Sequence, residues 1–288
     1  RLTFGPKYRV VEDPLRSKRA VSVLSNGHYS LMVTATGSGY SRWNGLAVTR
    51  WHADPTVDDW GSYIFLRDAK SGVWWSATPG PKPVEGENTQ TVFADEKAEF
   101  KKMVGAIESK LECIVATEAD AEGRRLTIKN FGETDRYIEV TSYGEIVMSS
   151  SDSDAAHPVF SKMFVKTEIG PTRDIIYAVR NKRNHDEPDI QIAHLMTGTS
   201  GRAAQFQAET DRRAFIGRGR ELTHARAFDS ITESLGGNQG FDGGLRGTQA
   251  RLVLAAHQVG SEDVVPGAHH VAAIDGHRHG RCGGEDEA

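Results

Sequence analysis

Apolar and polar residues alternate along most of this chain, and the alternation indicates short β-strands rather than helices. A period of two places successive side chains on opposite faces of a strand, so one face can be buried while the other is wet. Turn signals rich in Gly, Pro, Asn and Asp separate these stretches. The predicted strands cover residues 28–34, 46–51, 63–67, 91–94, 106–116, 124–129, 136–148, 163–168, 174–180 and 189–196.

The stretch 136–148 shows the alternation most clearly. Glu139 alternates with Ile138 and Val140, which predicts one apolar face and one wet face. Many short strands with few helices favour an all-β fold, a large antiparallel β-sandwich, over a fold of alternating strands and helices. Partly helical patterns occur only at residues 152–160 and 223–235.

The last part of the chain, residues 236–288, differs in composition from the rest. It holds 12 of the 30 glycines and 5 of the 11 histidines, and it has neither Trp nor Tyr. Only residues 251–256 and 264–265 read as capable of forming strands. So few large apolar residues predict a poorly structured tail behind a carbohydrate-associated β-sandwich of residues 1–235. Out-of-frame translation of a GC-rich gene would give a similar Gly- and His-rich composition, so both explanations stay open.

Composition and charge exclude several classes of protein. With 35 basic and 39 acidic residues the net charge is −4, which gives no sign of a nucleic-acid partner. Cys113 and Cys282 are too far apart in sequence for a disulfide framework or a zinc motif, so a reducing, cytoplasmic compartment is the default. No apolar run approaches the ~20 residues of a membrane helix, and no signal peptide is evident. Because the chain begins at Arg1 rather than Met, we expect a piece of a longer protein.

All five tryptophans lie within residues 43–75, among arginines, aspartates and glycines. Trp combines a large apolar face with one N–H donor, so it packs cores and also stacks on sugar rings. Such a cluster, interleaved with charged side chains, favours a surface that holds a polar ligand with flat apolar faces. A carbohydrate fits that description best.

Long motifs follow one another in a fixed order between residues 21 and 235. They are LSNGHYSLMVT from Leu24, GYSRWN from Gly39, LAVTRW from Leu46, DWG from Asp59, YIFLRD from Tyr63, RLTIKN from Arg125, EVTSYGE from Glu139, HPVFSKMFVKTE from His157 and ETDRRAFIGRGR from Glu209. This series resembles the N-terminal β-sandwich domain of glycoside hydrolase family 94, formerly glycosyltransferase family 36. Within that family it is most similar to the phosphorylase-like region of the cyclic β-1,2-glucan synthases.

The resemblance implies a galactose-mutarotase-like supersandwich and a parent activity on β-linked glucans, either synthesis or phosphorolysis. Family members invert the anomeric carbon. Inorganic phosphate attacks that carbon while an aspartate on a separate C-terminal (α/α)6 barrel protonates the glycosidic oxygen. Phosphate is therefore a co-substrate of the parent family, and no cofactor is implied. Since the acid lies on the barrel, no residue of this chain is assigned as catalytic, and we expect the chain alone to be inactive.

The resemblance also implies partners for the domain. They are a β-glucan oligosaccharide and the catalytic barrel, and a homodimer is a further option. The parent synthase is compatible with inner-membrane association, although this chain shows no membrane segment. Two alternative functions stay open: a stand-alone carbohydrate-binding module, and a non-functional remnant of a truncated gene.

Candidate substrate-binding or domain-interface residues lie in the tryptophan segment and in a basic GRGR loop. Alternation over residues 46–51 places Arg50 and Trp51 on opposite faces, so one of the two points outward. Adjacent Asp58 and Asp59 likewise point to opposite faces and cannot flank one glycosidic bond. Packing in the core or at a domain interface is as strong an interpretation as sugar contact. The candidates are Tyr40, Arg42, Trp43, Asn44, Arg50, Trp51, Asp59, Trp60, Arg218 and Arg220.

Two further motifs lead to no site. The GSGYSRW stretch from Gly37 lacks the lysine of a nucleotide-binding loop, and we expect it to form a turn between strands. A histidine-rich tract near the C-terminus has no predicted fold or carboxylate partner to fix its geometry, so no metal is predicted. Its members are His269, His270, His277 and His279.

Overall fold

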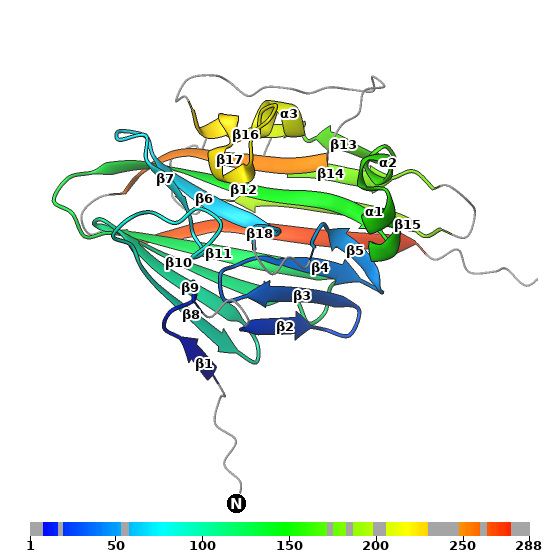
Figure 1. Cartoon of the computed structure of the whole chain (residues 1–288), viewed down its shortest axis with the longest axis horizontal. Helices are drawn as coiled ribbons and strands as arrows, with labels where there is room; N and C mark the ends of the chain where they lie inside the picture. The colour runs from blue at the N-terminus through cyan, green and yellow to red at the C-terminus, as the bar shows by residue number, and fades with distance from the viewer. Residues whose placement is uncertain are drawn as a thin grey trace, which may run out of the picture.

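Two antiparallel β-sheets, stacked on one another, dominate the computed structural model of the chain (Figure 1). The structure describes residues 8–16, 20–52, 58–171, 175–182, 187–197, 206–229, 248–259 and 264–277. The strands are β1 (Tyr8–Val11), β2 (Val21–Ser25), β3 (Tyr29–Thr34), β4 (Gly39–Trp43), β5 (Leu46–Thr49), β6 (Tyr63–Asp68), β7 (Trp74–Ser76), β8 (Asn88–Ala94), β9 (Ala98–Val104), β10 (Ile107–Val115), β11 (Ala121–Asn130), β12 (Arg136–Ser149), β13 (Val165–Ile169), β14 (Ile175–Arg180), β15 (Asp189–Thr197), β16 (Phe206–Asp211), β17 (Thr248–Val259) and β18 (Val264–His277). The helices are α1 (Ser151–Ala156), α2 (Pro158–Lys162) and α3 (Arg212–Phe215), with single 3-10 turns η1 (Leu222–His224) and η2 (Arg226–Phe228).

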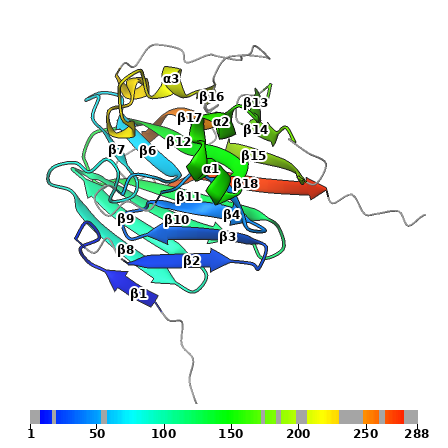
Figure 2. The same ribbon diagram turned by 45° about the vertical axis from the view of Figure 1, so that its right-hand side comes forward.

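The order of strands in each sheet follows from hairpins and a few long crossovers. One sheet runs β1-β8-β9-β10-β11-β18-β15-β14-β13, and the other runs β16-β17-β12-β5-β4-β3-β2, with β6 beside β12 and β7 beside β6. In both ribbon views α3 lies over β16 and β17, while α1 and α2 lie at the end of β12 (Figures 1 and 2). The predicted all-β sandwich is confirmed.

Each strand predicted from alternation is found, with ends that differ by three residues at most. The helical pattern at residues 152–160 corresponds to α1 and α2. The pattern at 223–235 corresponds to η1 and η2 as far as Phe228, whereas residues 230–235 lie outside the described part. The strands that the sequence analysis missed before residue 236 are β1, β2, β4, β7, β9 and β16.

Strand β12 is buried on both faces over most of its length. It alternates between exposed and buried positions only at its start, and from Val140 onward its side chains are buried. Val140 packs in the core between the sheets, whereas Tyr143 packs outward against Phe215 and Phe228 of the segment that follows β16. The prediction of a solvent-exposed face is therefore wrong for the strand beyond its first four residues, because α1, α2, α3 and the 3-10 turns cover that face.

The described residues of the range 236–288 form two long strands, which differs from the poorly structured tail that the composition predicted. Strand β17 lies between β12 and β16, and β18 lies between β11 and β15. Composition does not predict this strand pairing, because the neighbouring strands on both sides form backbone hydrogen bonds with β17 and β18 whatever the side chains are. Residues 236–247, 260–263 and 278–288 lie outside the described part, so the boundary at residue 235 and the reading frame stay predictions.

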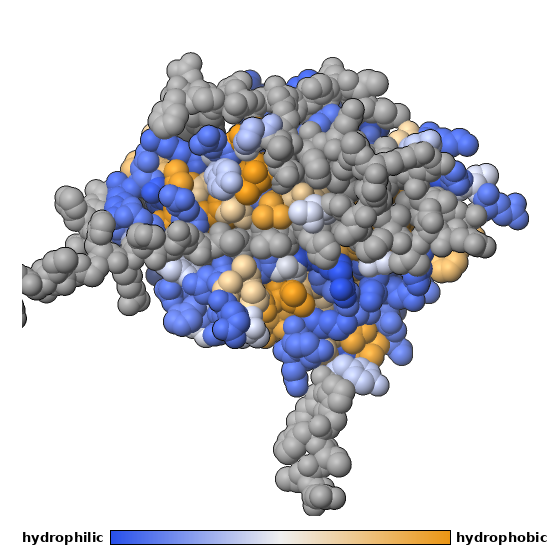
Figure 3. Space-filling view, turned by 180° about the vertical axis from the view of Figure 1, so that it is seen from behind, coloured by the Kyte–Doolittle hydropathy of each residue, from blue (hydrophilic) through white to orange (hydrophobic). Residues whose placement is uncertain are grey.

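Exposed large apolar side chains are distributed over several elements rather than gathered on one. They include Tyr8 on β1, Phe131 after β11, and Val159 and Met163 at α2. Seen from behind, hydrophobic side chains form separate patches among hydrophilic ones (Figure 3). Scattered exposure of this kind is ordinary for folded proteins and marks no site by itself.

Candidate carbohydrate site

The β4–β5 hairpin separates the candidate residues into two sets. Along β4 the exposed fraction alternates, so that Tyr40 and Arg42 face outward while Ser41 and Trp43 face the core. The tight turn that follows consists of Asn44 and Gly45, both at positive φ, as two-residue hairpins require. The hairpin thus presents Tyr40 and Arg42 together on its outer side.

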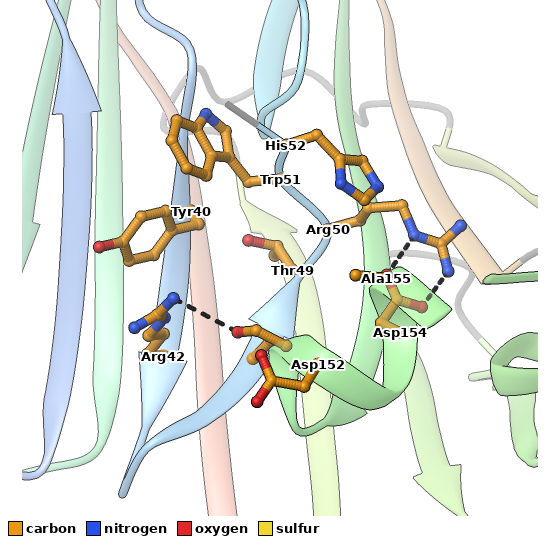
Figure 4. Close-up of a pocket in the computed structure, with 11 residues that line it drawn as sticks. Tyr40, Arg42, Thr49, Arg50, Trp51, His52, Asp152, Asp154 and Ala155 are labelled. Carbon is orange, nitrogen blue, oxygen red and sulfur yellow. Dashed lines mark hydrogen bonds and ion pairs between the residues drawn. The ribbon is translucent and has the colours of Figure 1, made fainter. Parts of the chain in front are cut away.

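Tyr40 and Arg42 line a cavity of about 200 Å³ between the hairpin and helix α1, here called the Tyr40 pocket (Figure 4). The rings of Tyr40 and Trp51 lie 5.3 Å apart, and the Arg42 guanidinium carbon lies 4.5 Å from the centre of the Tyr40 ring. Arg42 also donates a hydrogen bond of 3.3 Å to Ser151. The lining residues are Tyr40, Arg42, Ala47, Thr49, Arg50, Trp51, His52, Ser151, Asp152, Asp154 and Ala155.

Arg50 forms the inner wall of this pocket and is 4% exposed. Its guanidinium donates to both carboxylate oxygens of Asp154 on α1, with the Nε bond at 2.7 Å, and to Glu145 on β12. It also donates to the carbonyl of Pro158 at 3.2 Å. Burial opposes the charge, but Asp154 and Glu145 hold the pKa of Arg50 above its ordinary value. Arg50 therefore fixes α1 and α2 against the sheet. Of the pair Arg50 and Trp51, the outward residue is the half-buried Trp51.

Glu145 is the centre of this buried ion-pair network. Besides Arg50, it contacts Lys162 at 2.5 Å and Arg212 at 3.9 Å. Burial alone would raise the pKa of Glu145, but the charges of Lys162, Arg50 and Arg212 hold that pKa below its ordinary value. Burial lowers the pKa of Lys162, and contact with Glu145 opposes that shift. The Glu145 carboxylate thus connects β12 to α2, to α3 and to Arg50, the residue that follows β5.

A second cavity, of about 220 Å³, lies on the other side of Arg50 and is here called the Trp60 pocket. The ring of Trp60 meets the ring of His52, which lines the Tyr40 pocket, edge to face at 5.1 Å. The lining residues are Arg50, Asp59, Trp60, Gly61, Tyr143, Glu145, Arg212, Arg220, Glu221 and Leu222.

Positive and negative side chains balance in each pocket. In the Tyr40 pocket, Arg42 and Arg50 face two aspartates, at 152 and 154. In the Trp60 pocket, three arginines, at 50, 212 and 220, face three carboxylates, at 59, 145 and 221. An anionic ligand would need an excess of cations. Aromatic faces beside balanced hydrogen-bonding groups instead suit a neutral polyhydroxyl ligand.

The paired aspartates have different environments, but not through strand alternation, because both lie in the loop between β5 and β6. Asp58 accepts hydrogen bonds from the hydroxyls of Thr36 and Ser38, and Thr34 lies 3.2 Å away, so its carboxylate binds the turn after β3. Asp59 instead lines the Trp60 pocket. The two cannot act together on one bond.

Three candidates lie outside both pockets. Trp43 is 8% exposed, packs in the core with Tyr29, and donates from Nε1 to Asp120 at 2.6 Å. Asn44 occupies the hairpin turn, and Arg218 is exposed on the turn after α3. The structure thus joins seven of the ten candidates in the two pockets.

The GRGR loop lies at the rim of the Trp60 pocket. Its Arg220 pairs with Asp229. Asp211 caps α3 by accepting from the backbone of Arg213 at 2.8 Å. The loop is held in place by η2, which packs Phe228 onto the ring of Trp74 at 4.1 Å.

Sequence reasoning missed several lining residues that come from distant parts of the chain. For Glu145 and Asp154 the signal is a charge inside a predicted strand or helical stretch, because a buried charge needs a partner. The missed residues include His52, Tyr143, Glu145, Asp152, Asp154 and Arg212.

The described residues contain no group of three or more His, Cys, Asp or Glu placed to hold a metal ion. The side chains of the histidines at 269, 270 and 277 lie outside the described part, as does residue 279 entirely. Among the described helices, none is long and apolar enough to cross a membrane.

Fold and site together define a large antiparallel supersandwich domain with two charge-balanced pockets that aromatic side chains help to line. The chain belongs to the supersandwich domain family of glycosyl hydrolase 94, whose profile matches residues 6–260. That match continues past residue 235 and through β17.

Sequence matches to named proteins support this family membership. The chain is 56% identical over 236 residues to the cyclic beta-(1,2)-glucan synthase NdvB of Rhizobium meliloti (strain 1021), a match that covers 82% of the chain and 8% of that protein. It is 27% identical over 136 residues to N,N'-diacetylchitobiose phosphorylase of Vibrio proteolyticus, covering 46% of the chain and 17% of that protein. Among solved structures, a protein assigned as a kojibiose phosphorylase from the human microbiome superposes with a TM-score of 0.50 at 8% identity, covering 94% of this chain and 32% of that one. The chain therefore spans a small part of each relative.

Proposed function

We propose that this chain is the accessory supersandwich domain of a β-glucan-active synthase or phosphorylase and that it binds carbohydrate in the Tyr40 pocket. The observation that carries the proposal is the row formed by Arg42, Tyr40 and Trp51 beside balanced charges. Aromatic faces stack on the apolar faces of sugar rings, and arginine forks donate to hydroxyls. The identity to the glucan synthase favours β-1,2-linked glucose as the ligand.

A second part of the proposal concerns the rest of the parent protein. The domain would pack against a catalytic (α/α)6 barrel and contribute this pocket to the rim of the substrate path. The barrel would supply the acid, and inorganic phosphate would be the co-substrate. Support comes from the family and from the small share of each relative that the chain covers. A homodimer and a cytoplasmic location stay expectations from the sequence.

Titration of the purified chain with β-1,2-glucooligosaccharides, followed by calorimetry or NMR, tests carbohydrate binding. A pocket open to solvent on one side should bind with a millimolar Kd, about −4 kcal/mol. The double variant Arg42→Ala/Trp51→Ala should abolish binding and keep a cooperative thermal transition. The matched control Arg16→Ala/Tyr137→Ala removes an exposed arginine and an exposed aromatic outside both pockets. No saturable binding by the parent chain, or equal loss in the control, would contradict the proposal.

A further inference from the structure

The Tyr40 pocket and the Trp60 pocket are neighbours across one side chain. Arg50 lines both, and its ion pairs with Asp154 and Glu145 hold it in place between them. On the outer side, His52 of one pocket touches Trp60 of the other. The two cavities are therefore consecutive along one strip of surface.

The sizes of the two cavities are relevant to the ligand that each could hold. Pockets for drug-sized ligands measure roughly 300–1,000 Å³. Each cavity here is smaller, at about 200 Å³ and about 220 Å³. Together their volumes fall within that range. Each pocket therefore suits a group the size of one sugar ring, and the pair suits a short chain of rings.

A buried hydroxyl lies next to Gly61 of the Trp60 pocket, although its residue, Tyr63, is not itself one of the residues that line the cavity. Tyr63 is 1% exposed, and within the described part of the chain its hydroxyl has no hydrogen-bond partner. A Cβ at Gly61, which lines the pocket, would lie 3.1 Å from the ring carbon that carries this hydroxyl. Burial, followed by the charges of Asp58 and Asp59, raises the pKa of Tyr63, so the hydroxyl stays protonated and can donate. An unpartnered buried hydroxyl carries a desolvation cost that a ligand oxygen would offset.

We propose that the two pockets are adjoining subsites for a neutral glucan of at least two sugar units. The Tyr40 pocket takes one unit against Tyr40 and Trp51, and the Trp60 pocket takes the next unit against Trp60, with Tyr63 as a hydrogen-bond donor. The balance of charges in both pockets selects against phosphorylated or acidic sugars. This inference rests on the proposed carbohydrate binding and adds the length of the ligand and the second subsite.

The test compares glucose with the β-1,2-linked disaccharide sophorose in calorimetric titrations of the whole chain. Sophorose should bind about tenfold more tightly, equivalent to ~1.4 kcal/mol. Trp51→Ala should weaken both ligands. Trp60→Ala should reduce the affinity for sophorose to that of glucose.

Tyr63→Phe is the sharper variant, because it removes only the unpartnered hydroxyl. It should keep or raise the thermal midpoint, since no hydrogen bond within the described chain is lost. It should also reduce the gain from glucose to sophorose by about two- to tenfold, the value of one hydrogen bond.

Equal affinities of the parent chain for glucose and sophorose would overturn the two-subsite inference and leave the proposed function intact. If both Trp60→Ala and Tyr63→Phe kept the full affinity difference between glucose and sophorose, that result would overturn the two-subsite inference as well. No binding of either sugar would instead refute the proposed function itself.

Discussion

The substitution Arg50→Met tests the claim that a buried ion-pair network holds α1 and α2 against the sheet. Methionine keeps much of the volume of Arg50 but removes its charge. Asp154 would lose the guanidinium that contacts both its oxygens, whereas Glu145 would keep its contacts with Lys162 and Arg212. Removing one partner of a buried pair typically costs about 3–5 kcal/mol, because the other charge stays buried and uncompensated. Since Glu145 keeps two cations, we expect the lower end, about 3 kcal/mol.

Urea unfolding followed by tryptophan fluorescence measures this cost. With a slope near 3 kcal/mol per molar urea, the upper end for single domains, the midpoint should fall by about 1 M. The double variant Arg50→Met/Asp154→Leu should recover much of the loss, because it removes the stranded carboxylate together with its cation. The control Arg16→Met breaks the exposed pair with Asp13, which should leave the midpoint in place. A decrease for Arg50→Met no larger than the control's would refute the network as a structural anchor.

Three further predictions follow from other buried groups. Burial opposes the charge of Glu112, but Lys97 and Arg125 hold its pKa at about 2, so the ionised carboxylate stabilises the fold at pH values above its ordinary pKa of 4.5. This contribution should be lost as the pH falls from about 4.5 towards 2, and Glu112→Gln should flatten that part of a curve of stability against pH. Burial raises the pKa of Cys113 to about 11, so mass spectrometry should find this thiol unmodified by iodoacetamide in the folded chain and modified in urea. A Cβ at position 39 would lie 1.9 Å from the carbonyl oxygen of Met32, so Gly39→Ala should cost several kcal/mol in the same urea assay, and a loss under 1 kcal/mol would contradict this.

The sandwich could be predicted because strands such as β11 and β15 bury one face each, and alternation records that burial directly. Strand β9 shows where this signal fails. Its buried positions include Lys102, which lies next to a second lysine and so reads as part of a polar stretch. In the structure Lys102 pairs with Glu87 at 2.9 Å and donates to the carbonyl of Thr78 at 3.1 Å. A buried charge with distant partners therefore hides a strand from pattern reasoning.

The grouping of Trp43 with Tyr40 and Arg42 has a similar origin. The sequence GYSRW reads as a glycine-rich turn because its two aromatic residues flank two polar ones, so polar and apolar residues do not alternate. Once it is paired with β3, the period of two places Trp43 and Ser41 on the core side. Recognising one strand would have removed Trp43 from the site and kept Tyr40 and Arg42 together.

Alternation predicted opposite faces for Arg50 and Trp51, but both follow the end of β5 and line the Tyr40 pocket, and alternation could not tell which of them is buried. An isolated arginine is the residue expected to face solvent. The deciding partners, Glu145 and Asp154, lie 95 and 104 residues further along the chain and on different elements. Their carboxylates supply the charge that makes burial of a guanidinium tolerable, and this leaves the outward direction to Trp51. The orientation of the aromatic residue that shapes the Tyr40 pocket is thus set by long-range charge pairing, which no local pattern reports.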